Sequence, residues 1–233
     1  MRQRRFGLVS TLVVAALSLP AIVLAAPYTA IYTFTGSLGN QASEPVDANP
    51  IGAAFGAIVR GPGISAVAGL NSINSDGWTT GAVVDLNDYY EFTITPDANF
   101  ELDVTSLTFT FRRSATGPRE FEIRSSLNGF ATPVAGASVL DVTDNHRLGF
   151  GLFGFDDLTS AVVFRIYGFA AEGAAGTFRL GIALGEIGAA LPANLEVGGD
   201  LAAVPEPATL VLLGAGLSAL AWHRRRASAR SAR

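Results

Sequence analysis

Few residues in this sequence have side chains that could carry out catalysis. Cysteine is absent, which excludes disulfides, thiol nucleophiles, iron–sulfur clusters and thiolate zinc sites. His146 is the one histidine between the two apolar ends of the chain, and it could join a Ser/His/Asp triad with Asp141 or Asp144. No Gly-x-Ser-x-Gly motif is present to expose a serine nucleophile. We therefore interpret His146 as a surface-loop residue and expect no enzyme activity.

Three aromatic residues are the candidates for contact with a sugar ring. Trp78, Tyr89 and Tyr90 could stack on a sugar if they shared one exposed face. Tyr90 alternates in phase with apolar neighbours, so we predict that it belongs to the core. Trp78 follows a turn-like Asp-Gly pair and is the stronger stacking candidate, with a packing role as the favoured alternative.

Four of the basic residues lie close together in the sequence: Arg112, Arg113, Arg119 and Arg124. A guanidinium group binds a carboxylate or sulfate through two parallel hydrogen bonds, so this cluster could hold a uronate or a sulfated sugar. The alternative is that these arginines pair across strands with Glu120, Glu122 and other acids on a polar face. The predicted ligand-binding residues are Trp78, Arg112, Arg113 and Arg119.

Two loops carry oxygen-rich side chains of the kind that calcium prefers. The first contains Asn71, Asn74 and Asp76, and the second contains Asp85, Asn87 and Asp88. Neither follows the spacing of an EF-hand, and such residues also form ordinary turns. Calcium is therefore the one metal that the sequence suggests, and we assign no ligands to it. The sequence indicates no other cofactor.

Charge is divided into three blocks along the chain. Residues 1–26 carry three arginines and no acid, residues 27–203 carry eight arginines and nineteen acids, and residues 204–233 carry five arginines and one acid. The acidic middle lacks the basic surface that nucleic acid requires. Both basic ends flank apolar runs, and the mean hydropathy is +0.35. We therefore expect both ends to interact with the cytoplasmic membrane.

The N-terminus has the three parts of a secretory signal peptide. Arginines precede an apolar run from Phe6 to Leu19, and small residues follow it. We predict that residues 1–25 are the signal, and that signal peptidase cuts after Ala25 or, as the alternative, after Ala26.

The C-terminus has the parts of a sorting tail. Pro205-Glu206-Pro207 leads into an apolar run over residues 208–222, which Arg224, Arg225 and Arg226 follow. The prolines keep the triplet out of a helix. As a helix the apolar run would be about 22 Å long, which is adequate for a transmembrane stop-transfer signal whose arginines stay cytoplasmic.

Residues 204–228 therefore resemble a PEP-CTERM sorting signal. This resemblance implies an exported protein of a Gram-negative bacterium, often one that makes exopolysaccharide, and processing near the triplet by an exosortase. The precursor would be anchored in the membrane, and the mature protein would lie in the cell envelope or outside the cell.

Residues 26–190 alternate between apolar and polar side chains, which is the pattern of half-buried strands. The clearest runs begin at Tyr90, Phe100, Leu107, Val162 and Phe178. No window of this region predicts an amphipathic helix of useful length. We predict one all-β domain, a jelly-roll-type β-sandwich, followed by a Pro/Gly-bearing linker over residues 191–203.

A stretch from Tyr89 to Phe130 is also similar to a recurrent segment of secreted bacterial proteins. Its recognisable pieces are Tyr90-Glu91-Phe92-Thr93, Phe111-Arg112-Arg113-Ser114, Gly117-Pro118-Arg119 and Arg124-Ser125-Ser126-Leu127-Asn128-Gly129-Phe130. This resemblance implies a jelly-roll, carbohydrate-binding-like domain without an assigned activity.

The leading hypothesis is a non-enzymatic envelope or extracellular-matrix protein that is sorted by an exosortase and associates with exopolysaccharide. One alternative is a secreted glycan-active hydrolase, because the nineteen acids of the middle region offer many carboxylate pairs. The other is a purely structural or adhesive surface module.

Overall fold

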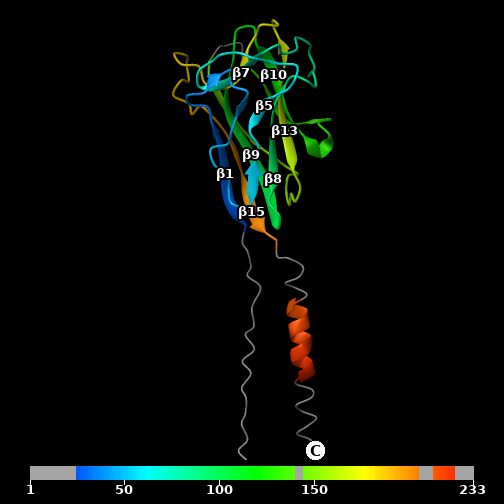
Figure 1. Ribbon diagram of the computed structural model, residues 1–233. Coiled ribbons are helices and arrows are strands. Elements are labelled where there is room, and N and C mark those ends of the chain that lie inside the picture. The colour runs from blue at the N-terminus through cyan, green and yellow to red at the C-terminus, as the bar shows by residue number, and fades with distance from the viewer. Residues whose placement is uncertain (1–24, 140–143, 205–211, 224–233) are drawn as a thin grey trace, which may run out of the picture.

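The computed structural model describes residues 25–139, 144–204 and 212–223 (Figure 1). Residues 26–203 form two sheets packed face to face, which confirms the predicted all-β sandwich. Sheet A contains β1 (Ala26–Thr33), β2 (Leu38–Gly39), β6 (Ser65–Ala66), β7 (Ser72–Asp76), β9 (Phe100–Arg113), β12 (His146–Gly151), β14 (Phe178–Gly181) and β15 (Asn194–Ala203). Sheet B contains β3 (Ser43–Glu44), β4 (Ala53–Phe55), β5 (Ile58–Arg60), β8 (Tyr89–Pro96), β10 (Pro118–Ser125), β11 (Pro133–Ser138) and β13 (Val162–Ala171).

The strand order places the longest strands near the middle of each sheet. Sheet A runs β1-β15-β9-β14-β7-β2, with β12 paired to β9 and β6 paired to β7. Sheet B runs β11-β10-β13-β8-β5-β3, with β4 paired to β8. Within the described residues of the sandwich, the helical segment is one short 3₁₀ turn, Ser126–Asn128, between β10 and β11.

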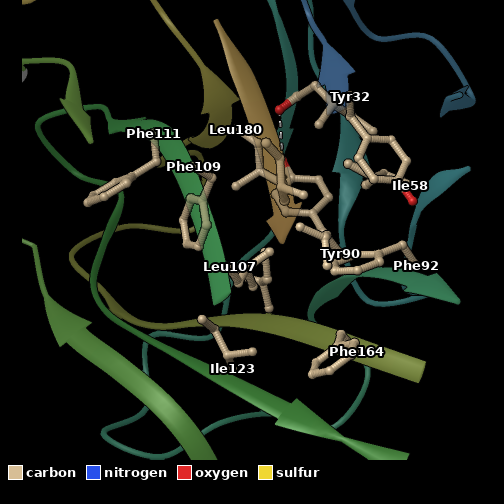
Figure 2. Packing of buried hydrophobic residues seen from close by; sticks show 14 of the residues in the cluster. Tyr32, Ile58, Tyr90, Phe92, Leu107, Phe109, Phe111, Ile123, Phe164 and Leu180 are labelled. Carbon is tan, nitrogen blue, oxygen red and sulfur yellow. Dashed lines mark hydrogen bonds between the residues drawn. The ribbon is translucent and has the colours of Figure 1, made fainter. Parts of the chain in front are cut away.

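The core lies between the two sheets and follows the alternation of the sequence. Figure 2 shows Phe109 and Phe111 of β9 among side chains of sheet B that include Ile123 and Phe164. These four side chains are at most 2% exposed. Each large apolar side chain buried in this way contributes about 1.5–3 kcal/mol of transfer free energy, so the two faces hold the sheets together.

A β-bulge joins two apolar runs that are out of phase in the sequence. Val104 and Leu107 are three residues apart, yet both are buried in β9. The register with β15 shifts at this point, because Val104 pairs with Gly199 whereas Ser106 pairs with Gly198. The extra residue of β9 lets one strand keep both runs on the core side.

The linker predicted over residues 191–203 is wrong for most of its length. Asn194–Ala203 forms β15, which lies between β1 and β9 in sheet A. Leu195 and Val197 are completely buried. Two glycines that suggested a flexible linker instead allow the bulge against β9. The domain therefore ends at the end of β15.

The first and last strands of the domain bring its two ends together. β1 and β15 are antiparallel, and Ala26 pairs with Leu201 (Figure 1). Beyond β15, the backbone N–H of Val204 donates to the carbonyl of Asn99 at 2.7 Å. The chain thus enters and leaves the sandwich at one pole, which we call the terminal pole.

Several predicted sorting features lie outside the described residues: residues 1–24 of the signal peptide, the Pro205-Glu206-Pro207 motif, and Arg224, Arg225 and Arg226. Ala25 precedes β1, and Ala26 is its first residue. Residues 212–223 are helical. Across the described ranges 25–139, 144–204 and 212–223, no helix is both long enough and apolar enough to cross a membrane. Residues 208–211 of the predicted membrane helix lie outside these ranges.

The position of β15 predicts where the folding unit ends. A fragment of residues 26–204 should show a β-type circular dichroism spectrum and unfold cooperatively, because it keeps every strand of both sheets. A fragment of residues 26–190 lacks β15 and leaves β1 and β9 without their shared neighbour. We expect this shorter fragment to lose cooperative unfolding. Equal cooperativity of the two fragments would contradict the assignment of β15 to the folded domain.

Candidate functional site

Trp78 is a core residue, so its predicted role as a sugar-stacking surface is wrong. The indole is 1% exposed, and it packs edge-on against Tyr90 at 5.4 Å and Phe178 at 5.7 Å between ring centroids. Its Nε1 donates to the carbonyl of Ser75 at 2.9 Å. Gly77, with a φ of 80°, directs the chain from β7 into the interior instead of closing a hairpin. The prediction that Tyr90 is buried is confirmed.

The arginines that are close together in the sequence lie on different surfaces. Neighbouring residues of a strand point to opposite faces. Arg112 therefore lies on the outer face of sheet A, whereas Arg113 points inward and its side chain is 1% exposed. Arg119 lies near the start of β10, and Arg124 lies on the outer face of sheet B. The prediction of one basic cluster is therefore wrong.

Each of these arginines has an acidic partner, but none of the described pairs joins neighbouring strands as the alternative interpretation predicted, because the acids lie in loops or on the arginine's own strand. Arg112 Nη2 is 2.8 Å from Glu186 Oε1, and Arg124 Nη2 is 2.7 Å from Glu122 Oε2. The partners of the other two arginines converge on a single carboxylate, Glu172. Of the two acids named from the sequence, Glu122 is a partner.

Glu172 holds two arginines from two parts of the chain. Its Oε2 accepts from Arg113 Nη2 at 2.8 Å, and its Oε1 accepts from Arg119 Nε and Nη2 at 2.9 and 2.6 Å. Arg113 also donates to the carbonyls of Ala115 and Gly117. The hydrogen bonds from Arg119 and Arg113 lower the pKa of the Glu172 carboxyl. This network fixes the turn between β9 and β10 against the end of β13.

Two of the six candidate calcium ligands, Asn74 and Asp76, lie in strand β7 and not in a loop. Three of the other four accept hydrogen bonds from nearby parts of the chain. Asn71 Oδ1 accepts the backbone N–H of Gly36 at 2.8 Å, and Asp85 Oδ1 accepts both nitrogens of Asn87 at 2.9 and 3.1 Å. Asp88 accepts a backbone N–H at 2.8 Å, and burial raises the pKa of its carboxyl. In the part of the chain that the structure describes, no three His, Cys, Asp or Glu side chains are grouped to hold a metal ion.

His146 begins strand β12 and is not a surface-loop residue as predicted. It pairs with Phe111 in the register, and the two ring centroids are 5.6 Å apart. Its Nε2 is buried and has no hydrogen-bond partner among the described atoms. Asp141 lies outside the described residues. The described contacts of His146 are therefore those of a packed ring and include no nucleophile.

The best candidate for a binding surface is the outer face of sheet B, formed by β8, β13 and β10. Alternate residues of these strands are core, so the residues between them point outward. One outward row consists of Glu122, Tyr167 and Tyr89, and the next consists of Arg124, Arg165 and Glu91. Tyr167 is completely buried beneath its neighbours, so Tyr89 supplies the partly exposed ring of its row. With Phe130 from the loop after β10, we call these residues the aromatic–arginine face.

Arg165 organises the aromatic–arginine face. Its guanidinium carbon is 4.1 Å from the ring centroid of Tyr89 and 4.0 Å from that of Phe130. Its Nε donates to Glu91 Oε2 at 2.7 Å. Tyr89 also packs edge-on against Tyr167, with 5.5 Å between centroids. Cation–π contacts and charge-assisted hydrogen bonds thus hold two partly exposed rings in fixed positions.

Arg124 links this face to a groove at the edge of sheet B. It donates through Nε and Nη2 to Glu122, and its guanidinium lies 5.6 Å from the centroid of Tyr167. Glu122 also lines the groove, which has a volume of about 410 Å³. The remaining lining residues are Glu120, Phe121, Pro133, Val134, Ala135, Gly136, Ala137, Ser138 and Phe169. Carboxylates, a hydroxyl and aromatic rings therefore line one continuous surface.

Such a surface can contact a sugar in two ways. Flat rings pack against the apolar C–H face of a pyranose, and carboxylate and guanidinium groups hydrogen-bond its hydroxyls. Burial raises the pKa of the Tyr89 hydroxyl, so it remains a protonated donor at neutral pH. Of the residues considered from the sequence, Tyr89 and Arg124 lie on this face. Arg165 and Phe130 were missed, because only the register of β13 and the path of a loop bring them to Tyr89.

Comparison with known proteins identifies the C-terminal segment. Residues 203–226 match the PEP-CTERM protein-sorting motif, which confirms the sorting signal predicted there. The matched segment contains Pro205-Glu206-Pro207 and the three arginines from Arg224 to Arg226. The chain therefore carries the signal of an exported, sorted protein. No curated protein matches this chain.

Three solved structures resemble the chain at low identity. A family 29 carbohydrate binding module is 13% identical, with 73% of this chain and 89% of that chain covered and a TM-score of 0.34. The K1 cleaved adhesin domain of Lys-gingipain from Porphyromonas gingivalis W83 is 14% identical, with coverages of 77% and 99% and a TM-score of 0.32. An arabinose-bound GH51 α-L-arabinofuranosidase is 13% identical, with coverages of 73% and 26% and a TM-score of 0.36. At these values the likenesses assign neither a ligand nor an activity to this chain.

The Glu172 network predicts a pH-dependent part of the stability. Glu172→Gln should lower the melting temperature at pH 7, because the buried guanidinium of Arg113 loses its charged partner. Since the pKa of Glu172 is lowered by folding, the wild-type advantage should be complete above the ordinary glutamate pKa of about 4.3 and should shrink as the pH falls below it.

Thermal unfolding across pH, followed by circular dichroism, measures this difference. Glu120→Gln is the matched control, because Glu120 accepts from the exposed hydroxyl of Ser138 and pairs with no arginine in the described structure. Equal melting temperatures of Glu172→Gln and Glu120→Gln at pH 7 would show that the network does not stabilise the fold.

Proposed function

We propose that this chain is an exported envelope or extracellular-matrix protein that is processed by an exosortase and holds exopolysaccharide without cleaving it. The match of residues 203–226 to the PEP-CTERM motif is the observation that carries the sorting part of this proposal. The aromatic–arginine face and the groove beside it support the polysaccharide part.

The charges of this face favour neutral sugars. Its two arginines are balanced by two acids, since Arg165 pairs with Glu91 and Arg124 pairs with Glu122. The adjoining groove adds Glu120 and Ser138 but no basic residue. Residues 27–203 as a whole carry eleven more acids than arginines. A polyanion would be repelled here, whereas a neutral, hydroxyl-rich chain finds donors and acceptors on both sides of the rings.

The same ion pairs favour binding over hydrolysis. A glycoside hydrolase needs one protonated carboxyl and one free carboxylate on either side of the bond that it cleaves. Glu91 and Glu122 are each held by an arginine at 2.7 Å. In each carboxylate one oxygen is thus already hydrogen-bonded to a guanidinium group. We therefore propose that no glycosidic bond is broken at this face.

A polysaccharide panel tests this function. The purified full chain, incubated with neutral and acidic polysaccharides, should be retained by a neutral one without releasing reducing ends. Tyr89→Ala and Phe130→Ala should each weaken retention about tenfold, the equivalent of about 1.4 kcal/mol, because each removes a ring that contacts the sugar.

Phe153→Ala is the control for these variants, since Phe153 is 92% exposed and lies in the loop after β12 of sheet A. It should bind like the wild type. Release of reducing ends would favour the hydrolase instead. Absence of both retention and release would favour a structural or adhesive module.

A further inference from the structure

A second charged site lies on the opposite side of the sandwich, on the outer face of sheet A. Arg179 of β14 pairs in the register with Arg112 of β9 on one side and with Asn74 of β7 on the other. The neighbours of Arg179 along its strand, Phe178 and Leu180, are completely buried in the core. The three polar residues therefore form one row that points away from the core.

Arg179 differs from the other arginines of the sandwich. It forms no hydrogen bond or ion pair with any residue in the described ranges, although its side chain is partly buried. Arg112, directly opposite, already donates to Glu186 at 2.8 Å. Burial and the charge of Arg112 both lower the pKa of Arg179. Like charges opposite each other on neighbouring strands cost stability, and Glu186 offsets part of this repulsion, since its charge raises the pKa of Arg179.

One side of the Arg179 guanidinium packs closely against a glycine. Gly69 lies next to it, and a Cβ at this glycine would be 3.1 Å from Arg179 Nη1 and 3.1 Å from Asn74 Nδ2. The backbone N–H of Gly69 donates to the carbonyl of Leu38 at 2.8 Å, so the loop is fixed in this position. A larger residue at position 69 would crowd the guanidinium, which is partly exposed beside this glycine.

Two loops border the row and carry exposed apolar side chains. Ile182 N–H donates to the carbonyl of Asn71 at 3.1 Å, which ties the loop after β14 to the loop that contains Gly69. Leu70 is 49% exposed and Leu184 is 60% exposed. The guanidinium thus lies in a polar row with apolar residues along the adjoining loops.

We propose that Arg179, supported by Arg112, binds an oxyanion of the carboxylate or sulfate type, either a free anion or such a group on an acidic sugar chain. The planar guanidinium of Arg179 supplies two parallel donors, and Arg112 supplies the second positive charge. Arg113 and Arg119 of the basic cluster predicted from the sequence are occupied by Glu172, so the proposed site shares Arg112 with that cluster and adds Arg179, which the sequence analysis did not consider. This site does not depend on the aromatic–arginine face.

Thermal unfolding of the full chain at constant ionic strength tests the site, with sodium sulfate replacing sodium chloride. At about ten times its dissociation constant, sulfate should raise the wild-type melting temperature by roughly 3 °C. Arg179→Gln should lose this rise. Without sulfate, Arg179→Gln should melt at or above the wild-type temperature, because its repulsion with Arg112 is gone. Arg119→Gln is the matched control and should keep the sulfate effect.

A second variant tests the position of the site, and two further probes distinguish a free anion from an acidic sugar chain. Gly69→Ala keeps every charge but crowds the guanidinium, so it should also weaken the sulfate effect. Glucuronate and polyglucuronate separate the two sources of the anion. Stabilisation by polyglucuronate supports an acidic sugar chain as the ligand, and stabilisation by sulfate alone supports a free oxyanion. No sulfate effect on the wild type, or an equal effect on Arg179→Gln, would overturn the proposal.

Discussion

The antiparallel pairing of β1 with β15 is the constraint on which the rest of the structure depends. It joins the first strand of the domain to the last, with Ala26 opposite Leu201. On its other side β15 pairs with β9, the longest strand of the sandwich. Contacts between residues so distant in sequence cannot form until the whole domain has been synthesised. The same pairing places both ends of the folded unit at the terminal pole.

This geometry leaves almost no chain between the fold and its sorting signals. β1 begins at Ala26, which directly follows the favoured signal-peptide cleavage site after Ala25, and β15 ends at Ala203, two residues before Pro205. The hydrogen bond from Val204 to Asn99 extends the ordered backbone to the edge of the motif. The proposed processing events therefore both occur next to one pole, and the outer faces of the two sheets remain available for ligands.

Alternation in the sequence predicted much of the fold and less of the site. The runs at Tyr90, Phe100, Leu107, Val162 and Phe178 all lie in strands, because burial of one sheet face imposes a period of two. β15 was missed because its paired glycines are typical of a linker, and only the bulge against β9 gives them a structural role. The period of two also explains why neighbouring arginines do not form a cluster, since Arg112 and Arg113 point to opposite sides of the same sheet.

The binding surfaces were harder to predict because they combine residues that are distant in the sequence. Trp78 has a turn signal before it, yet the chain folds inward there and buries the indole. Arg165 meets Tyr89 and Phe130 only through the register of β13 with β8 and the path of the loop after β10. Arg179 meets Arg112 only through the pairing of β14 with β9. Composition and motifs cannot report such contacts, whereas strand register can.

We propose that the folded domain is the working form, bounded by two processing sites at the terminal pole. Intact-mass spectrometry of the mature protein from the native cell tests it most directly. We predict an N-terminus at Ala26 or Pro27 and a C-terminus within residues 203–207, so that the sandwich keeps all of β15. A mature protein that ends at Arg233, or one cut within β15, would contradict the claim.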